Sequence, residues 1–325
     1  MSTPALVSIV TPCYNSAKFV RYCVESVLAQ DYPRVEHIVQ DGASTDGTVE
    51  ILRQYGQRVN WVSEHDRGQA DGLDKALKKC KGDFILVLNA DDMLLPHSIS
   101  WGVENMGKYP EAAVVYGDLR IVDETGAAIG VSYGPEPYSF ERLFCCEDVP
   151  PAQAAFIRRT CLEEVGLGAD PALDTCPDYE MWLRLGLKFP MKHVAEFVAE
   201  YRWHDNSEGR RGDMVEKFIS AKRQVMDRVL DDPQTPGTIR DLRRRAHSGL
   251  FLWAAWVAGD VGATRMAWRY GLKGLWLNPS KHGLIRFMAA TVLQSGLGRG
   301  GYHSSLYLLK KLRIVHGRTQ RRAEY

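Results

Sequence analysis

The stretch "GDFILVLNADD", residues 82–92, joins a run of hydrophobic residues to a polar end. An apolar run of this length after a glycine is typical of a buried β-strand. Asp91 and Asp92 follow it directly, and carboxylates at the end of a buried strand are unfavourable unless cations or hydrogen-bond donors meet them. The stretch therefore predicts a strand whose end holds a charged ligand. The structural alternative is that Asp92 caps a helix over residues 93–106.

The segments that precede this stretch alternate between strand-like and helix-like patterns. The predicted strands cover residues 7–12, 35–42 and 58–64, and the predicted helices cover 16–30, 44–55 and 68–80. Strands that alternate with helices of this length imply an α/β fold with a mostly parallel central sheet and helical crossovers.

Polar residues follow each of the four predicted strands. They are Thr11, Asp41, residues 64–66 and residues 89–92. In open α/β sheets, ligands bind at the carboxyl ends of the strands. We therefore expect these four segments to form one site.

The remainder of the chain is less regular up to about residue 212. It predicts a strand pair over 112–126, loops over 133–153 that cover the site, and short helices over 158–166 and 176–189. From about residue 212 the pattern is helical. Residues 254–279 resemble a helix-turn-helix unit of tetratricopeptide type, although one such unit is a weak signal.

Charge is distributed unevenly along the 325 residues. The net charge is +1, but residues 209–325 hold 22 Lys and Arg against 8 Asp and Glu, whereas residues 1–208 hold 19 against 32. We therefore predict two domains, 1–208 and 209–325. Either the two halves bind different partners or they attract each other.

The cysteines and the apolar segments bear on location. Seven cysteines without a C-x-x-C pair argue against a disulfide framework and a structural zinc site, and they favour a reducing cytoplasm. The N-terminus lacks a signal-peptide pattern. The apolar segment 248–262 is too short to span a membrane. We expect a cytoplasmic protein, peripheral to the inner membrane face if it binds lipid.

Four motifs match a known family in order and approximate spacing. They are "VSIVTPCYN" (7–15), "DGASTDGT" (41–48), "GDFILVLNADD" (82–92) and "PDYEMWLRL" (177–185). Over residues 5–206 the chain resembles the family 2 glycosyltransferases, which have the GT-A fold. The resemblance implies transfer of a sugar from a nucleotide-diphosphate donor with inversion at the anomeric carbon, and we expect UDP as the nucleotide.

The resemblance also implies which residues bind the donor. The departing diphosphate needs neutralising, and a divalent cation held by carboxylates does this. We expect Asp91 and Asp92 to hold Mg²⁺ or Mn²⁺, and Asp91 to contact the nucleotide as well. Thr11, Asp41 and Asp66 fall where relatives form the nucleotide pocket.

A carboxylate opposite the leaving group must take the proton of the acceptor hydroxyl. The family pattern places this base at Asp178, with Glu180 as the reserve and Asp174 as a remoter candidate; alternatively, Asp178 only caps its helix. His204 lies where many relatives have a histidine near the metal, but it also reads as an isolated surface residue.

Two further residues are weaker candidates for contacts with the donor sugar or the acceptor. Asn89 replaces the aspartate common in relatives, and its amide can bind a hydroxyl without adding charge. Arg202 can neutralise phosphate, although a structural role is nearly as plausible.

The basic helical half contains Arg clusters and several tryptophans, among them Trp253, Trp256, Trp268 and Trp276. Basic residues beside aromatics suit an anionic membrane surface, as expected for a polyprenyl-diphosphate-linked rather than a free glycan acceptor. The alternative is a helical bundle with the aromatics in its core. No nucleic-acid-reading motif accompanies the charge.

Two other functions are weighed against transfer. A sugar-nucleotide-forming nucleotidyltransferase needs a Gly- and Arg-rich loop after the first strand, where this chain has "TPCYNSAKF". An inactive sugar-nucleotide-binding scaffold is disfavoured by the presence of both an aspartate pair and a candidate base.

Overall fold

The computed structural model describes residues 4–134, 137–173, 175–205, 207, 212–280, 283–284 and 287. They form two compact units, each treated by itself. The sheet unit contains the described residues up to Leu143 together with Asp148–His204, and the helical unit contains Phe144–Glu147 together with the described residues from Asp205. The sequence does not predict that the four residues from Phe144 belong with the C-terminal helices.

The first half of the sheet is parallel, as the alternating pattern predicts. In space the order is β3-β2-β1-β4, and all three neighbouring pairs are parallel. The strands are β1 (Val7–Cys13), β2 (Val35–Asp41), β3 (Asn60–Ser63) and β4 (Phe84–Val87).

The second half of the sheet is mixed. The order continues from β4 through β8, β6 and β9 to β5, and β7 pairs with β6. β8 is antiparallel to β4 and β6, whereas β9 is parallel to β6. These strands are β5 (Met93–Leu94), β6 (Val114–Val122), β7 (Ala128–Ser132), β8 (Ala155–Arg158) and β9 (Met191–Arg202). The strand pair predicted over 112–126 is confirmed only in part, because β6 alone occupies this range and its hairpin partner β7 begins at Ala128.

The segment after Asp92 differs from the predicted helix over 93–106. Met93 and Leu94 pair with β9, and helix α4 (Ser98–Lys108) begins only after Pro96. Proline disfavours helical geometry in the residue before it, so Leu95 stays outside the helix. The N-cap of α4 is His97. The helix-capping alternative for Asp92 is therefore wrong.

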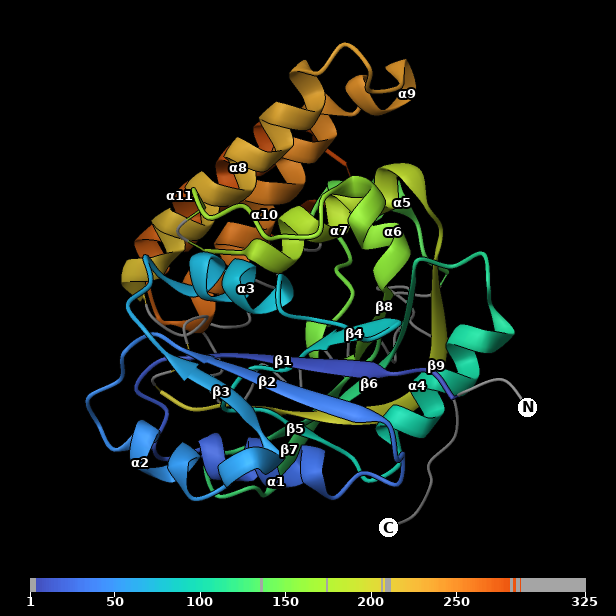
Figure 1. Ribbon diagram of the computed structural model, residues 1–325. Coiled ribbons are helices and arrows are strands. Elements are labelled where there is room, and N and C mark those ends of the chain that lie inside the picture. Colours follow the sequence, from blue (N-terminus) through green and yellow to red (C-terminus); the bar gives the residue numbers. More distant parts are fainter. Residues whose placement is uncertain are drawn as a thin grey trace, which may run out of the picture. The chain divides into compact units, whose positions relative to one another are not determined.

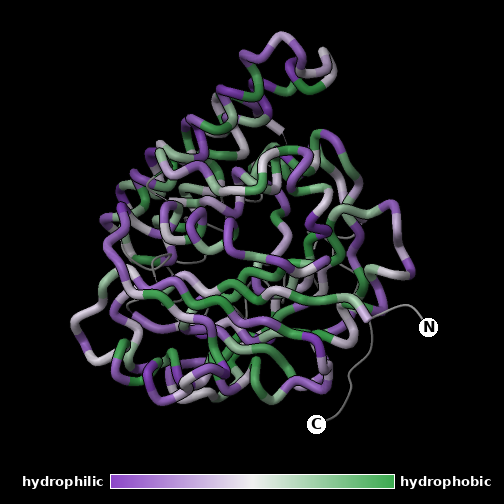
Figure 2. The backbone as a smooth tube through the Cα atoms, in the orientation of Figure 1, coloured by the Kyte–Doolittle hydropathy of each residue, from purple (hydrophilic) through white to green (hydrophobic). Residues whose placement is uncertain are grey.

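Helices pack on both faces of the parallel strands. Helices α1 (Val20–Leu28) and α2 (Thr48–Arg53) lie on one side of the strands and α3 (Gln69–Leu77) lies on the other (Figure 1). Hydrophobic stretches run through the strands at the centre of the unit (Figure 2). Ile9, Leu86, Val115 and Phe156 are fully buried there. Burial of this kind contributes roughly 1.5–3 kcal/mol for each large side chain.

Three helices follow in the less regular part of the sheet unit. They are α5 (Phe140–Phe144), α6 (Arg159–Val165) and α7 (Pro177–Lys188), and a 3₁₀ turn, η2, covers Ala152–Ala154. α6 and α7 match the predicted helices. Pro177 at the first turn of α7 suits a helix start, because that position needs no amide donor.

The helical unit is built around a helix hairpin. α10 (Arg243–Asp260) turns at Gly262, whose φ is +77°, into α11 (Thr264–Leu277), which ends before Asn278. The other helices are α8 (Val215–Asp231) and α9 (Gly237–Arg240), after a 3₁₀ turn, η4, at Gly212–Met214. In the part of the chain that the structure describes, no helix is long and apolar enough to cross a bilayer.

Candidate active site

The carboxyl ends of β3, β2, β1 and β4 lie in a row at one edge of the sheet. The register places Cys13 beside Asp41 and Asp41 beside Ser63. On the other side of β1, the amide of Leu88 donates to the carbonyl of Val10 at 2.9 Å. Parallel pairing therefore brings the Asp41 segment and the Asn89–Asp92 segment to strand ends on either side of β1.

Asp41 is fully buried, and its carboxylate accepts from four donors, of which the Cys13 thiol at 3.5 Å is the longest contact. The carboxylate also accepts hydrogen bonds from the Ser44 amide (3.0 Å), the Ser44 hydroxyl (2.5 Å) and the Ser63 hydroxyl (2.6 Å). These contacts fix its orientation before any ligand arrives. The nucleotide-binding role of Asp41 stays a prediction.

Asp66 lies beside the end of β2 because two glycines leave space for it. A Cβ atom at Gly42 would stand 2.7 Å from Asp66 Oδ2, and one at Gly72 would stand 3.0 Å from the same atom. The amide of Gly68 donates to Asp66 Oδ1 at 3.0 Å. The structure thus brings Asp66 next to the Asp41 segment, where the nucleotide pocket is predicted.

Thr11 points into the protein interior. Its side chain is fully buried, and its hydroxyl lies 3.0 Å from His37 Nε2 and 3.8 Å from Cys23 Sγ. The hydroxyl is thus engaged with side chains of the core, and a contact with nucleotide stays a prediction.

His37 makes the stability of the protein dependent on pH. Burial lowers the pKa of His37 to about 3, from an ordinary 6.5. The unfolded chain therefore binds a proton that the folded protein excludes as the pH falls below 6.5. We expect this histidine to reduce the free energy of unfolding by about 2 kcal/mol between pH 7 and pH 5. Urea unfolding at both pH values measures it.

The matched comparison for this prediction uses two substitutions. His37→Gln removes the titrating group and should flatten the pH dependence by that amount. His65→Gln changes an exposed histidine and should leave the pH dependence unchanged. Equal pH dependence in the parent and in His37→Gln would contradict the prediction.

Asp92 is a fully buried carboxylate at the centre of a hydrogen-bond network. Its Oδ1 accepts from the amide of Arg202 (2.9 Å), and its Oδ2 accepts from Gln153 Nε2 (2.7 Å) and Asn89 Nδ2 (3.2 Å). Burial, and then the neighbouring Asp91 carboxylate, raises the pKa of Asp92 well above its usual range. With both oxygens engaged, Asp92 is suited to positioning rather than to direct metal binding.

The network explains why asparagine is suitable at position 89. The side-chain amide of Asn89 donates to Asp92 Oδ2 at 3.2 Å, and the backbone carbonyl of Asn89 accepts from the Asp92 backbone amide at 3.1 Å. An aspartate at position 89 would set a second carboxylate against a buried one, which is unfavourable. Asn89 therefore belongs to the support of the site, and its predicted contact with sugar remains untested.

Gln153 is a site residue that the sequence analysis does not identify. It lies in η2, within the segment predicted to form loops over the site, and it comes from a part of the chain without a motif. Its side chain is 8% exposed and donates to Asp92 across 61 positions of sequence. No local pattern signals a contact of this range.

Arg202 is buried, and its side chain binds the backbone carbonyls of other segments. Its guanidinium donates to the carbonyls of Asp91 (3.1 Å), Asp123 (3.1 Å) and Glu124 (3.3 Å), and it lies 5.3 Å from the ring centroid of Phe19. These contacts join β9 to the end of β4 and to the β6–β7 turn. The predicted contact of Arg202 with phosphate stays a prediction.

Asp91 and His204 form the more accessible half of the acidic cluster. The Asp91 side chain is 29% exposed, and its Oδ2 lies 3.0 Å from His204 Nε2. The carboxylate suits Mn²⁺ or Mg²⁺ when diphosphate oxygens and water complete the coordination, and the imidazole beside it can add a nitrogen ligand for a metal that accepts one. Within the described ranges no group of three or more His, Cys, Asp or Glu side chains is arranged to hold a metal by itself. The pair therefore fits a cation that binds together with the donor.

Asp178 and Glu180, two residues apart at the start of α7, have different surroundings. Glu180 is buried and forms a bidentate ion pair with Arg184, at 2.5 and 2.9 Å. The Asp178 carboxylate is half-buried and accepts from the amide of Tyr179 at 2.8 Å. Of the two, Asp178 is the carboxylate without an ion pair in the part of the chain described. Asp174 lies outside the described residues.

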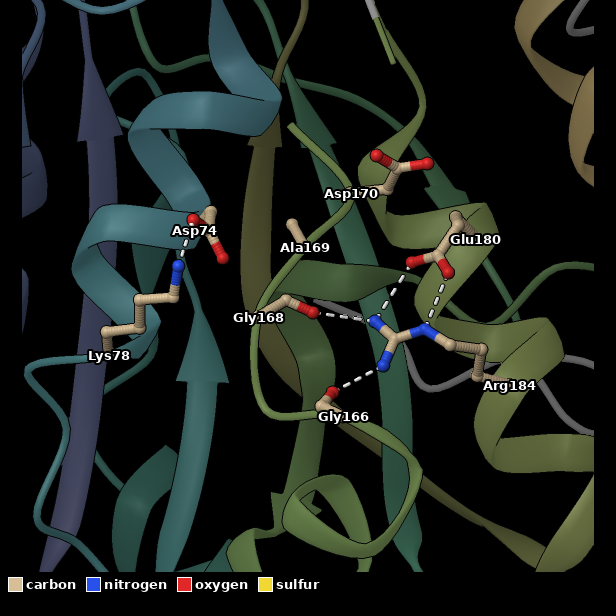
Figure 3. A pocket seen from close by; sticks show the side chains of 8 residues that line it. All are labelled: Asp74, Lys78, Gly166, Gly168, Ala169, Asp170, Glu180 and Arg184. Atoms are coloured by element: carbon tan, nitrogen blue, oxygen red, sulfur yellow. Dashed lines mark hydrogen bonds and ion pairs between the residues drawn. The ribbon is translucent and has the colours of Figure 1, made fainter. Parts of the chain in front are cut away.

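Arg184 anchors the loop before α7. Besides Glu180, it donates to the carbonyls of Val165 (3.0 Å), Gly166 and Gly168 (2.7 Å). Figure 3 shows Glu180 and Arg184 pointing toward each other and Arg184 toward this loop, in a hollow also lined by Asp74 and Lys78. The guanidinium thereby fixes the start of the helix that carries Asp178.

Replacing Arg184 should destabilise the sheet unit. Arg184→Gln leaves Glu180 charged and buried, so we expect the free energy of unfolding to fall by about 3 kcal/mol. The double variant Glu180→Gln/Arg184→Gln should be less destabilised than the sum of the single variants, because no unpaired charge remains. Urea unfolding measures all three.

Lys188→Gln is the control, because it breaks an ion pair with Glu164 in which both side chains are about half exposed. It should change the free energy of unfolding by less than about 1 kcal/mol. Additive effects of the two single substitutions would contradict the predicted coupling.

α7 is tied to the acidic cluster through the segment that holds Gln153. The indole of Trp182, on α7, donates to the carbonyl of Pro150 at 3.1 Å, and Gln153 donates to Asp92 three residues later. Both contacts are buried. The helix that carries Asp178 and the strand end that carries Asp91 are thus connected by one short, well-packed segment.

The mixed sheet, with acidic side chains at the ends of its parallel strands, has the GT-A fold. Residues 8–165 match the family described as "Glycosyl transferase family 2". The chain is 30% identical over 208 residues to the putative teichuronic acid biosynthesis glycosyltransferase TuaG of Bacillus subtilis, covering 62% of this chain and 81% of that protein. The chain therefore belongs to glycosyltransferase family 2.

Other matches extend this comparison. The chain is 31% identical over 192 residues to the chondroitin synthase of Escherichia coli, covering 58% of this chain but only 28% of that longer protein.

Solved structures support the fold. A mannosyltransferase from Pyrobaculum calidifontis in complex with GDP-Man and Mn²⁺ superposes with a TM-score of 0.60 at 16% identity, covering 96% of this chain and 88% of that one. S. aureus TarS 1-349 in complex with UDP-GlcNAc gives a TM-score of 0.53 at 14% identity, covering 93% and 92%.

Proposed function

We propose that the protein transfers a sugar from a UDP-sugar to a hydroxyl of a glycan, with inversion at the anomeric carbon, in the synthesis of a polysaccharide. The observation that carries the proposal is the arrangement at the end of β4. Asp91 is partly exposed and paired with His204, while Asp92, Asn89 and Gln153 hold the segment rigidly behind it. A pre-oriented carboxylate of this kind would hold the divalent cation that neutralises a departing diphosphate.

In the proposed reaction, the acceptor oxygen forms a bond to the anomeric carbon as the bond from that carbon to the diphosphate oxygen breaks. UDP leaves, and the hydroxyl proton passes to the Asp178 carboxylate. Attack from the face opposite the leaving group inverts the configuration. Asp178 suits this role because it lies at the start of α7 without the ion pair that engages Glu180.

Asp91 and His204 would hold Mg²⁺ or Mn²⁺. The cation, when bound with the donor, would neutralise the diphosphate. The protein's own contribution is to hold the Asp91 segment in place, through the contacts of Asp92 and the donation of Arg202 to the Asp91 carbonyl. The Mn²⁺ complex of the Pyrobaculum mannosyltransferase supports metal use within this fold.

Asp41 and Asp66 would hold the nucleotide at the end of β2. UDP is proposed as the nucleotide because the TarS neighbour binds UDP-GlcNAc, although the mannosyltransferase neighbour binds GDP-Man. The acceptor is proposed to be a glycan, either free or linked to polyprenyl diphosphate. The cysteine pattern, seven residues without a C-x-x-C pair, supports a reducing compartment such as the cytoplasm.

A thermal-shift screen of sugar nucleotides tests the proposal without knowledge of the acceptor. A donor at 100 times its Kd should stabilise the protein by about 2.7 kcal/mol. We expect stabilisation by one UDP-sugar, and more of it with Mn²⁺ or Mg²⁺ than with a chelator. Stabilisation by a sugar 1-phosphate and a nucleoside triphosphate instead would indicate a nucleotidyltransferase. Donor binding without slow donor hydrolysis would indicate an inactive scaffold.

A further inference from the structure

One face of α11 exposes large apolar and basic side chains together. Trp276 is 78% exposed, Leu272 56% and Trp268 40%. Arg265 and Lys273 are also exposed, and the Arg269 side chain is 72% exposed. We call this set the α11 face; its members are Arg265, Trp268, Arg269, Leu272, Lys273 and Trp276.

The α11 face consists of two parallel rows. Trp268, Leu272 and Trp276 are spaced four residues apart, and so are Arg265, Arg269 and Lys273. Residues at this spacing lie above one another on a helix, so an apolar row runs beside a basic row for about 12 Å. α11 contains no aspartate or glutamate.

The helical unit packs mainly against the opposite face of α11, and from the α11 face the Lys273 ammonium lies 4.1 Å from the ring centroid of Phe251 on α10. Tyr270 stacks on Phe251 of α10 with the ring centroids 5.8 Å apart, and the Ser248 hydroxyl of α10 donates to the Gly274 carbonyl at 2.7 Å. The rings of Phe287 and Trp268 form a T-shaped pair with their centroids 5.1 Å apart, and Trp268 remains 40% exposed. The hairpin therefore does not require the exposed tryptophan and leucine side chains for its own packing.

The aromatic residues of the helical half are accordingly divided between core and surface. Trp253 on α10 is half-buried, with Phe218 against its ring and the Lys222 ammonium 4.9 Å from its centroid. Trp268 and Trp276 lie on the α11 face instead. The helical-bundle interpretation thus fits Trp253, and the membrane interpretation stays a prediction that rests on Trp268 and Trp276.

We propose that the α11 face docks on an anionic phospholipid surface. Tryptophan is favoured at the interface between lipid and water, and leucine gains from burial among the acyl chains. The adjacent basic row complements the phosphate headgroups, at about 1 kcal/mol for each Lys or Arg near the surface. The long contact of Arg269 with Glu216, 4.0 Å between two exposed side chains, does not neutralise this row. The proposal is independent of the transfer reaction.

Vesicle flotation with the full chain tests the proposal. We expect binding to vesicles of phosphatidylglycerol and phosphatidylcholine in equal parts, and little binding to phosphatidylcholine alone. Arg265→Gln/Arg269→Gln should weaken binding by about fivefold for each charge removed. Leu272→Ser/Trp276→Ser should weaken it about tenfold or more. High salt should also weaken it, because it screens the basic row.

The control is Ile129→Ser/Val131→Ser, which removes two exposed apolar side chains from β7 in the sheet unit and should leave flotation unchanged. Circular dichroism checks that each variant is folded, and Trp276→Ser alone replaces the double variant if that one unfolds. Binding that is equal for both vesicle types, or unaffected by the α11 substitutions, overturns the proposal. The proposal is also overturned if the parent protein sediments as a dimer that the α11 substitutions dissociate and does not bind vesicles.

Discussion

Asp178→Asn should lower kcat by roughly a thousandfold and leave donor affinity nearly unchanged. The asparagine side chain keeps the shape of the carboxylate, and its carbonyl oxygen can still accept the hydrogen bond from the backbone amide of Tyr179. It does not, however, accept the proton of the acceptor hydroxyl. The loss should therefore appear in the chemical step. Release of UDP in the presence of acceptor measures kcat, and calorimetric titration with the donor measures affinity.

Glu164→Gln provides the matched control, because it also neutralises one acidic side chain, on α6, where that side chain is half exposed. It should retain full activity. Full turnover by Asp178→Asn would remove Asp178 as the base. A loss of donor affinity as large as the loss of turnover would instead indicate that Asp178 binds the donor.

Asp91→Asn should abolish the metal-dependent part of donor binding, with a loss of affinity of about a hundredfold or more. Asn89, Gln153 and the Arg202 amide continue to hold the segment through Asp92, so the fold should change little. Calorimetric titration with the UDP-sugar, in Mn²⁺ and in chelator, measures the effect. The parent should differ between the two conditions, and the variant should not.

Asp92→Asn distinguishes the metal-binding role from the positioning role. With asparagine at position 92, the side-chain NH₂ group would face at least one of the hydrogen-bond donors that now donate to the Asp92 oxygens, and that donor would lose its acceptor. We expect it to lower the free energy of unfolding by about 1–3 kcal/mol, measured by urea unfolding. If Asp91→Asn destabilises the fold and Asp92→Asn removes only metal dependence, the two assignments must be exchanged.

The strand and helix pattern of residues 7–92 was predictable because each period is local. Alternation of hydrophobic runs with amphipathic segments specifies parallel strands and places Asp41 and Asp91 at strand ends. In the second half of the sheet, only β6 lies within a segment predicted to form strands. β5 has two residues and β8 has four, so each acquires its conformation from its neighbours rather than from a periodicity of its own.

The candidate site was likewise predictable from the sequence only in part. Sequence motifs identify Asp91, Asp92, Asp178 and Glu180, but adjacent or nearly adjacent carboxylates are equivalent in a motif. Their surroundings differ only in three dimensions: Gln153 and Arg202 engage Asp92, His204 lies beside Asp91, and Arg184 engages Glu180. Gln153 and Arg202 come to Asp92 from distant segments, whereas Arg184 lies one helical turn from Glu180 within the same motif.

The amino-acid sequence by itself determined the α/β class, the edge of the sheet at which polar groups gather, and the basic helical half, because hydrophobic period and charge are properties of short segments. Only the tertiary structure decided which carboxylates are buried and which are accessible, and which tryptophans of the helical unit face water. Those outcomes depend on which distant residues come into contact, and desolvation and hydrogen bonding act on a side chain only through such contacts.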